Sequence, residues 1–235
     1  MLSNIEKIIF IIIAISAFGA SYVTFGKMFK VISVGSQPID WKKALWNFPK
    51  GLKVFISQNT LFKTRPIVGF IHALVAWGFT LYLIVNVVDV LYGFIPDFHF
   101  FPNYFIGKMY RIFVDVFTVL VLVGVFYFLV RRFIFNDKRL IINKPVMISE
   151  EARIGMRNDS LLVGLFILFH VGARFLSASF EIAKNGVDDF QPAATTVSLL
   201  WSNLSSENII LFEHITWWIA LGLILGFLPY FPFSK

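Results

Sequence analysis

Five long apolar segments, separated by polar or Pro- and Gly-containing stretches, dominate the pattern of the chain. They cover residues 7–28, 66–92, 109–131, 160–183 and 208–230. At about 1.5 Å per residue, each is long enough to cross a hydrocarbon core of about 30 Å as an α-helix. The pattern predicts an all-α integral membrane protein whose residues 1–235 form a single five-helix bundle. The first run has no small-residue cleavage site, so we expect a retained helix rather than a signal peptide.

The basic residues are concentrated in two of the polar stretches. Residues 27–65 hold eight Lys/Arg against one acid, Asp40, and residues 131–157 hold seven against three acids. Loops rich in Lys and Arg stay in the cytoplasm, which predicts an outside N-terminus and a cytoplasmic C-terminus. We therefore expect a multi-pass protein of the cytoplasmic (inner) membrane. The net charge of +7 then reflects topology, and nucleic acid is not an expected partner.

Part of the first basic stretch, WKKALWNFPKGLKVF (residues 41–55), mixes Trp, Phe and Leu with Lys. A helix lying on the inner membrane surface has this composition. A positively charged loop without regular structure is the alternative, and both interpretations stay open.

The sequence contains no cysteine. This excludes disulfides, cysteine-ligated iron–sulfur clusters and thioether attachment of haem to this chain. Three histidines lie inside predicted spans, at depths of ~10 Å (His72), ~17 Å (His170) and ~20 Å (His214) from the cytoplasmic side. His170 and His214 are thus expected at similar depth on two helices, as the axial ligands of one b-type haem would be. His99, in an outer loop between aromatic residues, is expected to have a structural role.

Other residues near these histidines suit a haem. Arg174 lies one turn from His170, and Arg65 lies two turns before His72, so each is placed to neutralise a propionate. Gly69 and Ala76 flank His72 and would leave space for a flat ring. The alternatives are a hydrogen bond between helices for a lone histidine and simple close packing for the small residues.

Two stretches and one arginine carry a resemblance to known proteins: GFIHALVAWGF (69–79), EHITWWIALGLILGFLPYFPFSK (213–235) and Arg65. The chain resembles the cytochrome b membrane subunit, the gamma subunit, of respiratory nitrate reductase. It is still more similar to the N-terminal membrane domain of iron–sulfur oxidoreductases related to heterodisulfide reductase. The resemblance implies a haem b protein that moves electrons between the (mena)quinone pool and cytoplasmic iron–sulfur centres. Those centres would belong to a partner protein or to a further domain.

The chain departs from the gamma-subunit pattern in three places. The second histidine of that helix, ten residues after the first, is replaced by Tyr82, and His170 has no counterpart, so we expect His170 to supply the missing ligand. A histidine that follows the PFS motif in the family has no equivalent before Lys235. We therefore expect one haem b, and a second if His72 gains a ligand from beyond Lys235 or from a partner chain.

Polar residues near the outer ends of the spans are the candidates for a quinone site: Asn86, Asp89, Asp115, Glu181 and Glu213. Carboxylates there would accept the protons that a quinol releases on oxidation. Ordinary interfacial polarity is the alternative, and Asp115 has the i+4 spacing for a salt bridge with Arg111. The competing function is a haem-free transporter or assembly subunit whose intramembrane His and Arg bind a solute or protons. The internal repeats that favour a transporter are not evident.

Overall fold

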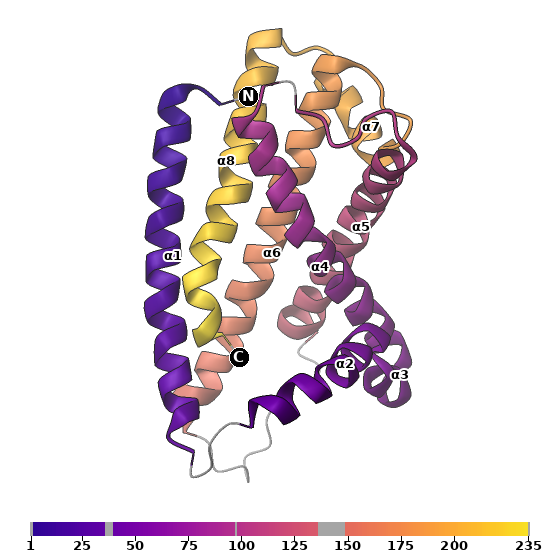
Figure 1. Cartoon of the computed structure of the whole chain (residues 1–235). Helices are drawn as coiled ribbons and strands as arrows, with labels where there is room; N and C mark the ends of the chain where they lie inside the picture. The colour runs from indigo at the N-terminus through magenta and orange to yellow at the C-terminus, as the bar shows by residue number, and fades with distance from the viewer. Residues whose placement is uncertain (1, 36–39, 97, 136–148, 235) are drawn as a thin grey trace.

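The computed structural model describes residues 2–35, 40–96, 98–135 and 149–234, and these residues form helices and connecting loops without a strand (Figure 1). Five helices within these ranges are long and apolar enough to cross a membrane. They are α1 (Asn4–Ser33), α4 (Pro66–Phe94), α5 (Phe105–Leu129), α6 (Glu150–Asn185) and α8 (Ser206–Tyr230). Each predicted span coincides with one of them, and the third runs into a π-helical turn, η1 (Val130–Ile134). The predicted fold class is therefore confirmed.

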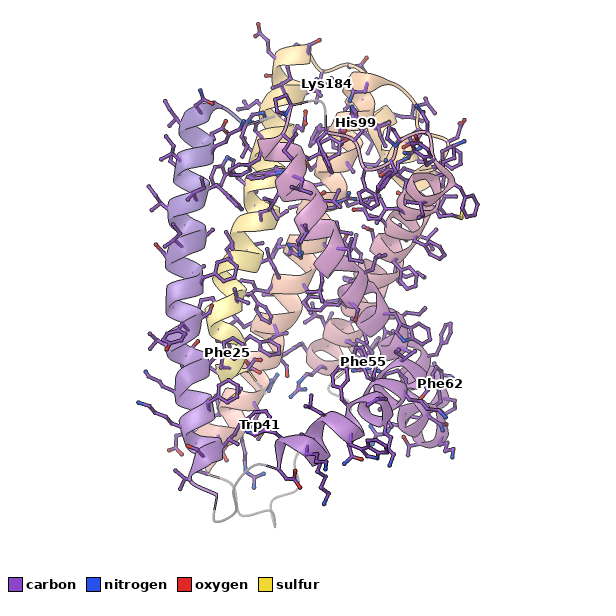
Figure 2. The ribbon with its side chains drawn as sticks, viewed as in Figure 1. Phe25, Trp41, Phe55, Phe62, His99 and Lys184 are labelled. Carbon is purple, nitrogen blue, oxygen red and sulfur yellow. The ribbon has the colours of Figure 1, made fainter. Side chains whose placement is uncertain are left out.

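Short elements mark the two ends of the bundle (Figure 1). At one end, which we call the α2 end, lie α2 (Trp41–Ser57), α3 (Asn59–Thr64) and the 3₁₀ turn η4 (Phe231–Phe233). At the opposite α7 end lie α7 (Pro192–Ser198), the 3₁₀ turn η3 (Leu199–Trp201) and the N-terminal turn of α1. Figure 2 shows the corresponding side chains, with Trp41 and Phe55 at the α2 end and His99 and Lys184 at the α7 end.

The segment around residues 41–55 is helical, so the loop alternative for it is wrong. The Asp40 carboxylate accepts the backbone N–H of Lys43 at 2.9 Å and so caps the first turn of α2. Large apolar side chains of this helix are not covered by the rest of the chain: Trp41 is 65% exposed and Phe48 is 66% exposed. An amphipathic helix with an uncovered apolar face is typical of a segment that lies on a membrane surface.

The long helices pack in the order α1, α8, α6, α5, α4, and α6 and α8 make the most extensive contact. The main buried cluster joins α4, α5 and α6 and includes Tyr82, Val114, Val121 and Val171. Glycine permits the close approach of α4 to α5, because a Cβ at Gly78 would lie 2.3 Å from Val121. The outer surfaces carry many exposed Ile, Val and Phe side chains, as a lipid-facing protein requires.

Gly69 has a different role from the one expected from the sequence. A Cβ at this position would lie 2.8 Å from the backbone carbonyl of Leu61, so α3 packs directly against α4 here. The space beside Gly69 is therefore filled by backbone and holds no flat ring. The alternative interpretation, a close packing position, is confirmed.

Candidate functional site

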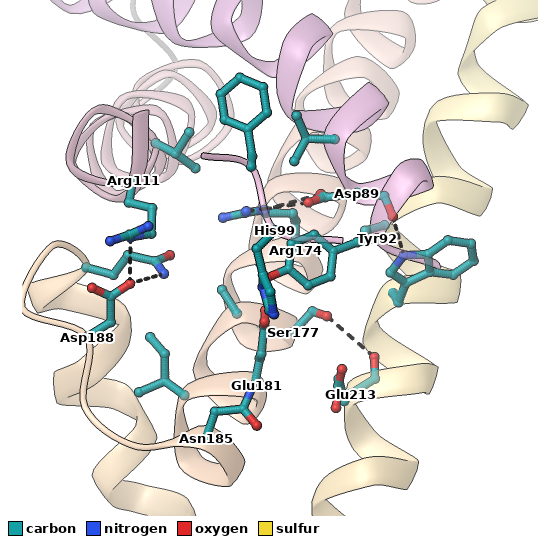
Figure 3. A pocket seen from close by; sticks show the side chains of 18 of the residues that line it. Asp89, Tyr92, His99, Arg111, Arg174, Ser177, Glu181, Asn185, Asp188 and Glu213 are labelled. Carbon is teal, nitrogen blue, oxygen red and sulfur yellow. Dashed lines mark hydrogen bonds and ion pairs between the residues drawn. The ribbon is translucent and has the colours of Figure 1, made fainter. Parts of the chain in front are cut away.

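A cavity of about 240 Å³ opens at the α7 end between α4, α5, α6 and α8 (Figure 3). It forms where the polar ends of four apolar helices converge, so the same positions that end the spans supply its walls. Its polar lining is contributed by Asp89, Tyr92, His99, Tyr110, Arg111, Arg174, Ser177, Glu181, Asn185, Asp188, Gln191 and Glu213. Apolar side chains, among them Val88, Val114 and Leu221, complete the walls.

An ion pair between α6 and α4 lines the cavity. The Arg174 guanidinium lies 3.3 Å (Nε) and 3.5 Å (Nη2) from the two carboxylate oxygens of Asp89. Both side chains are largely covered, with 13% and 16% exposed. The backbone carbonyl of Asp89 also accepts the indole N–H of Trp217 at 3.1 Å, which fixes this turn of α4 against α8. A charged pair held inside a span is expensive, which makes this pair a candidate functional position.

Three polar atoms in the cavity wall are buried without a hydrogen-bond partner among the described residues: the hydroxyl of Tyr110, Nε of Arg111 and Oε2 of Glu213. Nε of Arg111 and Oε2 of Glu213 have ion-pair partners in Asp188 (2.9 Å) and Lys184 (3.6 Å). Buried polar groups are nearly always hydrogen-bonded, so the Tyr110 hydroxyl is placed to bond a polar molecule that enters the cavity. The cavity thus offers a hydroxyl, a guanidinium and carboxylates to such a molecule.

The mouth of the cavity is braced by Arg111 on α5. Its Nε lies 2.9 Å from Asp188 in the loop before α7, and its guanidinium lies 5.3 Å from the ring centroid of Phe190. Arg111 therefore pairs with Asp188 and not with Asp115, because the loop brings a closer carboxylate to it than its own helix does. The i+4 salt bridge considered from the sequence is not formed.

Asp115 has a structural position instead. It is 2% exposed, and its carboxylate accepts the backbone N–H groups of Ala193 (2.7 Å) and Ala194 (3.0 Å) at the start of α7. These amides have no partner within their own helix, so Asp115 satisfies them and holds α7 against α5. Of the five quinone-site candidates, Asp89, Glu181 and Glu213 line the cavity, whereas Asp115 and Asn86 do not.

The imidazole of His170 lies deeper in the bundle, 2% exposed, with its ring centroid 5.6 Å from that of Tyr82. Its Nδ1 lies 2.7 Å from the backbone carbonyl of Ala220. A carbonyl can only accept, so Nδ1 carries the proton and Nε2 presents a lone pair. Nε2 is buried and has no partner among the described residues. A histidine fixed in this way by its other nitrogen is suited to ligate a metal.

The space beside His170 limits what it can bind in this arrangement. A gap of about 10 Å³ adjoins the ring, lined by apolar side chains of α4, α6 and α8, namely Phe79, Phe166, Ile167, Leu223, Ile224 and Phe227. No second imidazole lines it. Nε2 is therefore placed to ligate a metal. The gap is far smaller than the roughly 300–1,000 Å³ of cofactor pockets, so it does not hold a porphyrin in this arrangement.

His214 occupies a separate groove between α8 and α1. Its Nδ1 lies 3.1 Å from Oε1 of Glu6, which also accepts the indole N–H of Trp218 at 3.2 Å. Ala220, to which His170 is bonded, lies six residues further along α8, or ~9 Å along its axis. The structure therefore does not bring His170 and His214 to a common cavity, and their rings lie at different levels.

His72 and Arg65 lie toward the α2 end. His72 is exposed on α4, makes no hydrogen bond with a described residue, and has its ring 6.3 Å from that of Phe128. Arg65 is exposed at the junction of α3 and α4, where its backbone carbonyl accepts the N–H of Gly69. Within the described ranges, no group of three or more His, Asp or Glu side chains is close enough to hold a metal ion without another ligand.

Sequence reasoning missed several residues of the cavity, including Tyr92, His99, Tyr110 and Asp188. Tyr92 and Tyr110 sit near the ends of predicted spans, and that position was the available signal. Asp188 lies in a loop, and nothing in its local sequence indicates that it meets Arg111.

Comparison with known proteins gives two distant relatives. No protein-family model matches the chain, and no solved structure matches it. The EtfAB:quinone oxidoreductase of Syntrophomonas wolfei is 24% identical over 176 residues, which are 73% of this chain and 23% of the relative. The probable iron–sulfur-binding oxidoreductase FadF of Bacillus subtilis is 24% identical over 187 residues, 76% of this chain and 23% of the relative. The chain thus spans less than a quarter of these oxidoreductases, and the similarity supports a general electron-transfer role.

Proposed function

We propose that the protein is the membrane part of a quinone-linked oxidoreductase. It binds a quinone or quinol in the α7-end cavity and exchanges electrons, through haem b, with iron–sulfur centres of a cytoplasmic partner protein or domain. The observation that carries the proposal is the cavity itself. It combines a buried Arg174–Asp89 pair with a Tyr110 hydroxyl that has no hydrogen-bond partner among the described residues and with the Glu213 carboxylate, which is ion-paired with Lys184.

A quinone matches this lining in polarity. It has a flat apolar ring with an oxygen at each end, and the cavity has apolar walls with polar groups at separate positions. The Arg174 guanidinium and the Tyr110 hydroxyl are donors to a quinone oxygen. The carboxylates of Glu181 and Glu213 accept protons from a quinol, as general bases do. The relative that is named a quinone oxidoreductase supports the same substrate class.

We propose His170 as a haem ligand because its Nε2 is buried, oriented and unpaired. Its ring packs against Tyr82. By the resemblance to the nitrate reductase gamma subunit, Tyr82 stands at the position of that subunit's second histidine, so α6 would supply the imidazole that α4 lacks. When bound, haem b supplies a one-electron carrier between the two-electron quinone and the iron–sulfur centres. Because the gap beside His170 is too small for a porphyrin, haem binding would require α4 to move away from α6 and α8.

His214 remains a proposed ligand for a related reason. Glu6 engages its Nδ1, which leaves Nε2 for a metal. We propose that His72 ligates haem only when a second group comes from a partner chain or from further sequence, with Arg65 then close to an inner propionate. Arg174 is ion-paired with Asp89 and lines the α7-end cavity. We therefore propose it as a residue of the quinone site and not as the partner of a haem propionate.

We further propose that the α7 end faces the outside and the α2 end faces the cytoplasm. The concentration of Lys and Arg in residues 27–65 and 131–157 supports this orientation. Protons from a quinol would then leave on the outer side, and the iron–sulfur partner would dock at the α2 end.

The test is a reduced-minus-oxidised optical spectrum and a haem count on the native assembly. A b-type band is expected, and His170→Ala and His170→Met should each lower the count by one haem. The matched control is His99→Ala, an exposed histidine outside the His170 gap, which should leave the count unchanged. A native assembly without haem would favour the transporter or assembly-subunit alternative.

A further inference from the structure

A hydrogen-bonded connection links the quinone cavity to the surface at the α7 end. The Tyr92 hydroxyl lies 2.6 Å from Nδ1 of His99, and the two rings meet edge to face at 5.5 Å. The Glu181 carboxylate lines the same cavity and interacts electrostatically with Tyr92. All three side chains line the cavity and gather in its centre in Figure 3.

Exposure changes along this connection. Glu181 and Tyr92 are partly buried inside the converging helices, whereas His99 is exposed on the loop between α4 and α5. A phenol hydroxyl has one proton to donate and two lone pairs to accept, so Tyr92 can accept from one neighbour while donating to the other. The ring nitrogens of His99 can take a proton on one side and release one on the other.

Charged groups surround the connection from each neighbouring helix. Arg111 comes from α5, Arg174 and Lys184 come from α6, Glu213 comes from α8, and Asp89 precedes Tyr92 on α4. The cations are already paired, with Asp188, Asp89 and Glu213 respectively. Glu181 is therefore the cavity carboxylate with no ion pair to a described residue, and it interacts with the Tyr92 hydroxyl, which is hydrogen-bonded to the exposed His99.

We propose that Glu181, Tyr92 and His99 form a proton relay between the cavity and the water at the α7 end, an inference that rests on the quinone site proposed above. When a quinol is oxidised, an O–H bond of the quinol breaks and its proton binds the Glu181 carboxylate. The two electrons pass to the iron–sulfur acceptor named in the proposed function. Glu181 then protonates the Tyr92 oxygen as Tyr92 protonates Nδ1 of His99, and His99 releases a proton from Nε2 to water. The exposed imidazole returns to its starting tautomer by exchanging protons with water, so the second quinol proton follows the same route, and quinone reduction reverses it.

The test uses the native assembly in membranes, with duroquinol as the electron donor. Tyr92→Phe keeps the ring and removes the hydroxyl, and His99→Gln removes the titratable nitrogen from an exposed position. Each should lower kcat by at least about tenfold, less than the ~10²–10⁴-fold effect of a direct acid–base group because water replaces part of the relay. The KM for duroquinol and the binding of a quinone-analogue inhibitor should stay within about twofold of wild type. Added imidazole should restore much of the rate of the His99 variant.

The matched control is Tyr104→Phe, which removes a hydroxyl at the same end of the bundle from a side chain that is 69% exposed and does not line the cavity. Its kcat should equal that of wild type. Wild-type kcat in both relay variants would overturn the relay while leaving the quinone site standing. A loss of kcat that imidazole does not rescue and that comes with a raised KM would also overturn the relay, because that pattern indicates a structural role. A wild-type assembly that does not oxidise duroquinol would overturn the proposed function and the relay together.

Discussion

The two ends of the bundle differ in whether their charged side chains are ion-paired or exposed. At the α7 end, acidic groups from four segments are paired inside the protein: Asp89 with Arg174, Asp188 with Arg111, Glu213 with Lys184 and Glu6 with His214. At the α2 end, the four lysines of α2 are exposed and make no ion pair with a described residue. Charge held inside a protein organises a site, whereas charge left outside attracts a surface or a partner. The comparison thus separates an end whose charged groups are ion-paired from an end whose helical lysines are exposed.

The largest effect is expected from breaking the Arg174–Asp89 pair. Arg174→Met leaves an uncompensated carboxylate among apolar helices, and the loss of stability should be about 3–5 kcal/mol, as for other buried pairs. The double variant Arg174→Met with Asp89→Leu removes both charges and should recover most of that stability. Quinol oxidation should stay at least about a hundredfold below wild type in both. Thermal unfolding in detergent and duroquinol kinetics measure the two effects separately, and an active double variant would remove this pair from the quinone site.

A smaller loss of stability is expected at Asp115. This carboxylate lies at the same end but does not line the cavity, and it accepts hydrogen bonds from the start of α7. Asp115→Ala removes the acceptor of two α7 amides and should cost about 2 kcal/mol, since hydrogen bonds to charged groups contribute roughly 1.5–3 kcal/mol each and water partly replaces them. The KM for duroquinol should be unchanged in membranes at a temperature where the variant is folded. A raised KM without a stability loss would return Asp115 to the list of quinone-binding residues.

At the α2 end, the sharpest test concerns the two faces of α2. Phe48 and Lys50 lie on opposite sides of this helix by their helical spacing. Because the chain has no cysteine, single-cysteine spin labels report without background. A label at Phe48→Cys should be shielded from a water-soluble relaxation agent in reconstituted vesicles, and a label at Lys50→Cys should be accessible. Equal accessibility at both sites would mean that α2 does not lie on the membrane.

Because the chain has no cysteine, labelling of single introduced cysteines also tests the orientation of the bundle, and these substitutions should have little effect on function. Lys42→Cys, Lys43→Cys and Arg153→Cys should not react with a membrane-impermeant maleimide added to intact cells, and should react once the cells are opened. Glu207→Cys, near the start of α8, is the control for the outer side and should react in intact cells. The reverse pattern would invert the topology and place the proposed quinone site on the cytoplasmic side.

The sequence was sufficient to predict the five long helices, because each apolar run is too long for any other element. It also placed Asp89, Glu181 and Glu213 near one end, since counting residues along a helix gives the position of each residue along the helix axis. Counting does not give the direction in which a side chain points. His170 and His214 were predicted at one depth, yet one bonds α8 at Ala220 and the other faces Glu6, 208 residues away in sequence. The pairings Arg111–Asp188 and Asp115–α7 likewise depend on how a loop folds back, which local spacing does not encode.

We propose that quinol bound at the α7 end delivers electrons to a haem held inside this bundle. The most direct test is anaerobic addition of duroquinol to the oxidised native assembly while the optical spectrum is recorded. A reduced b-type band should appear in wild type. In the Arg174→Met, Asp89→Leu variant, the band should appear with dithionite and remain nearly absent with duroquinol. A wild-type haem that dithionite reduces and duroquinol does not reduce, or an assembly without haem, would show that quinol at the α7 end does not deliver electrons to haem in this bundle.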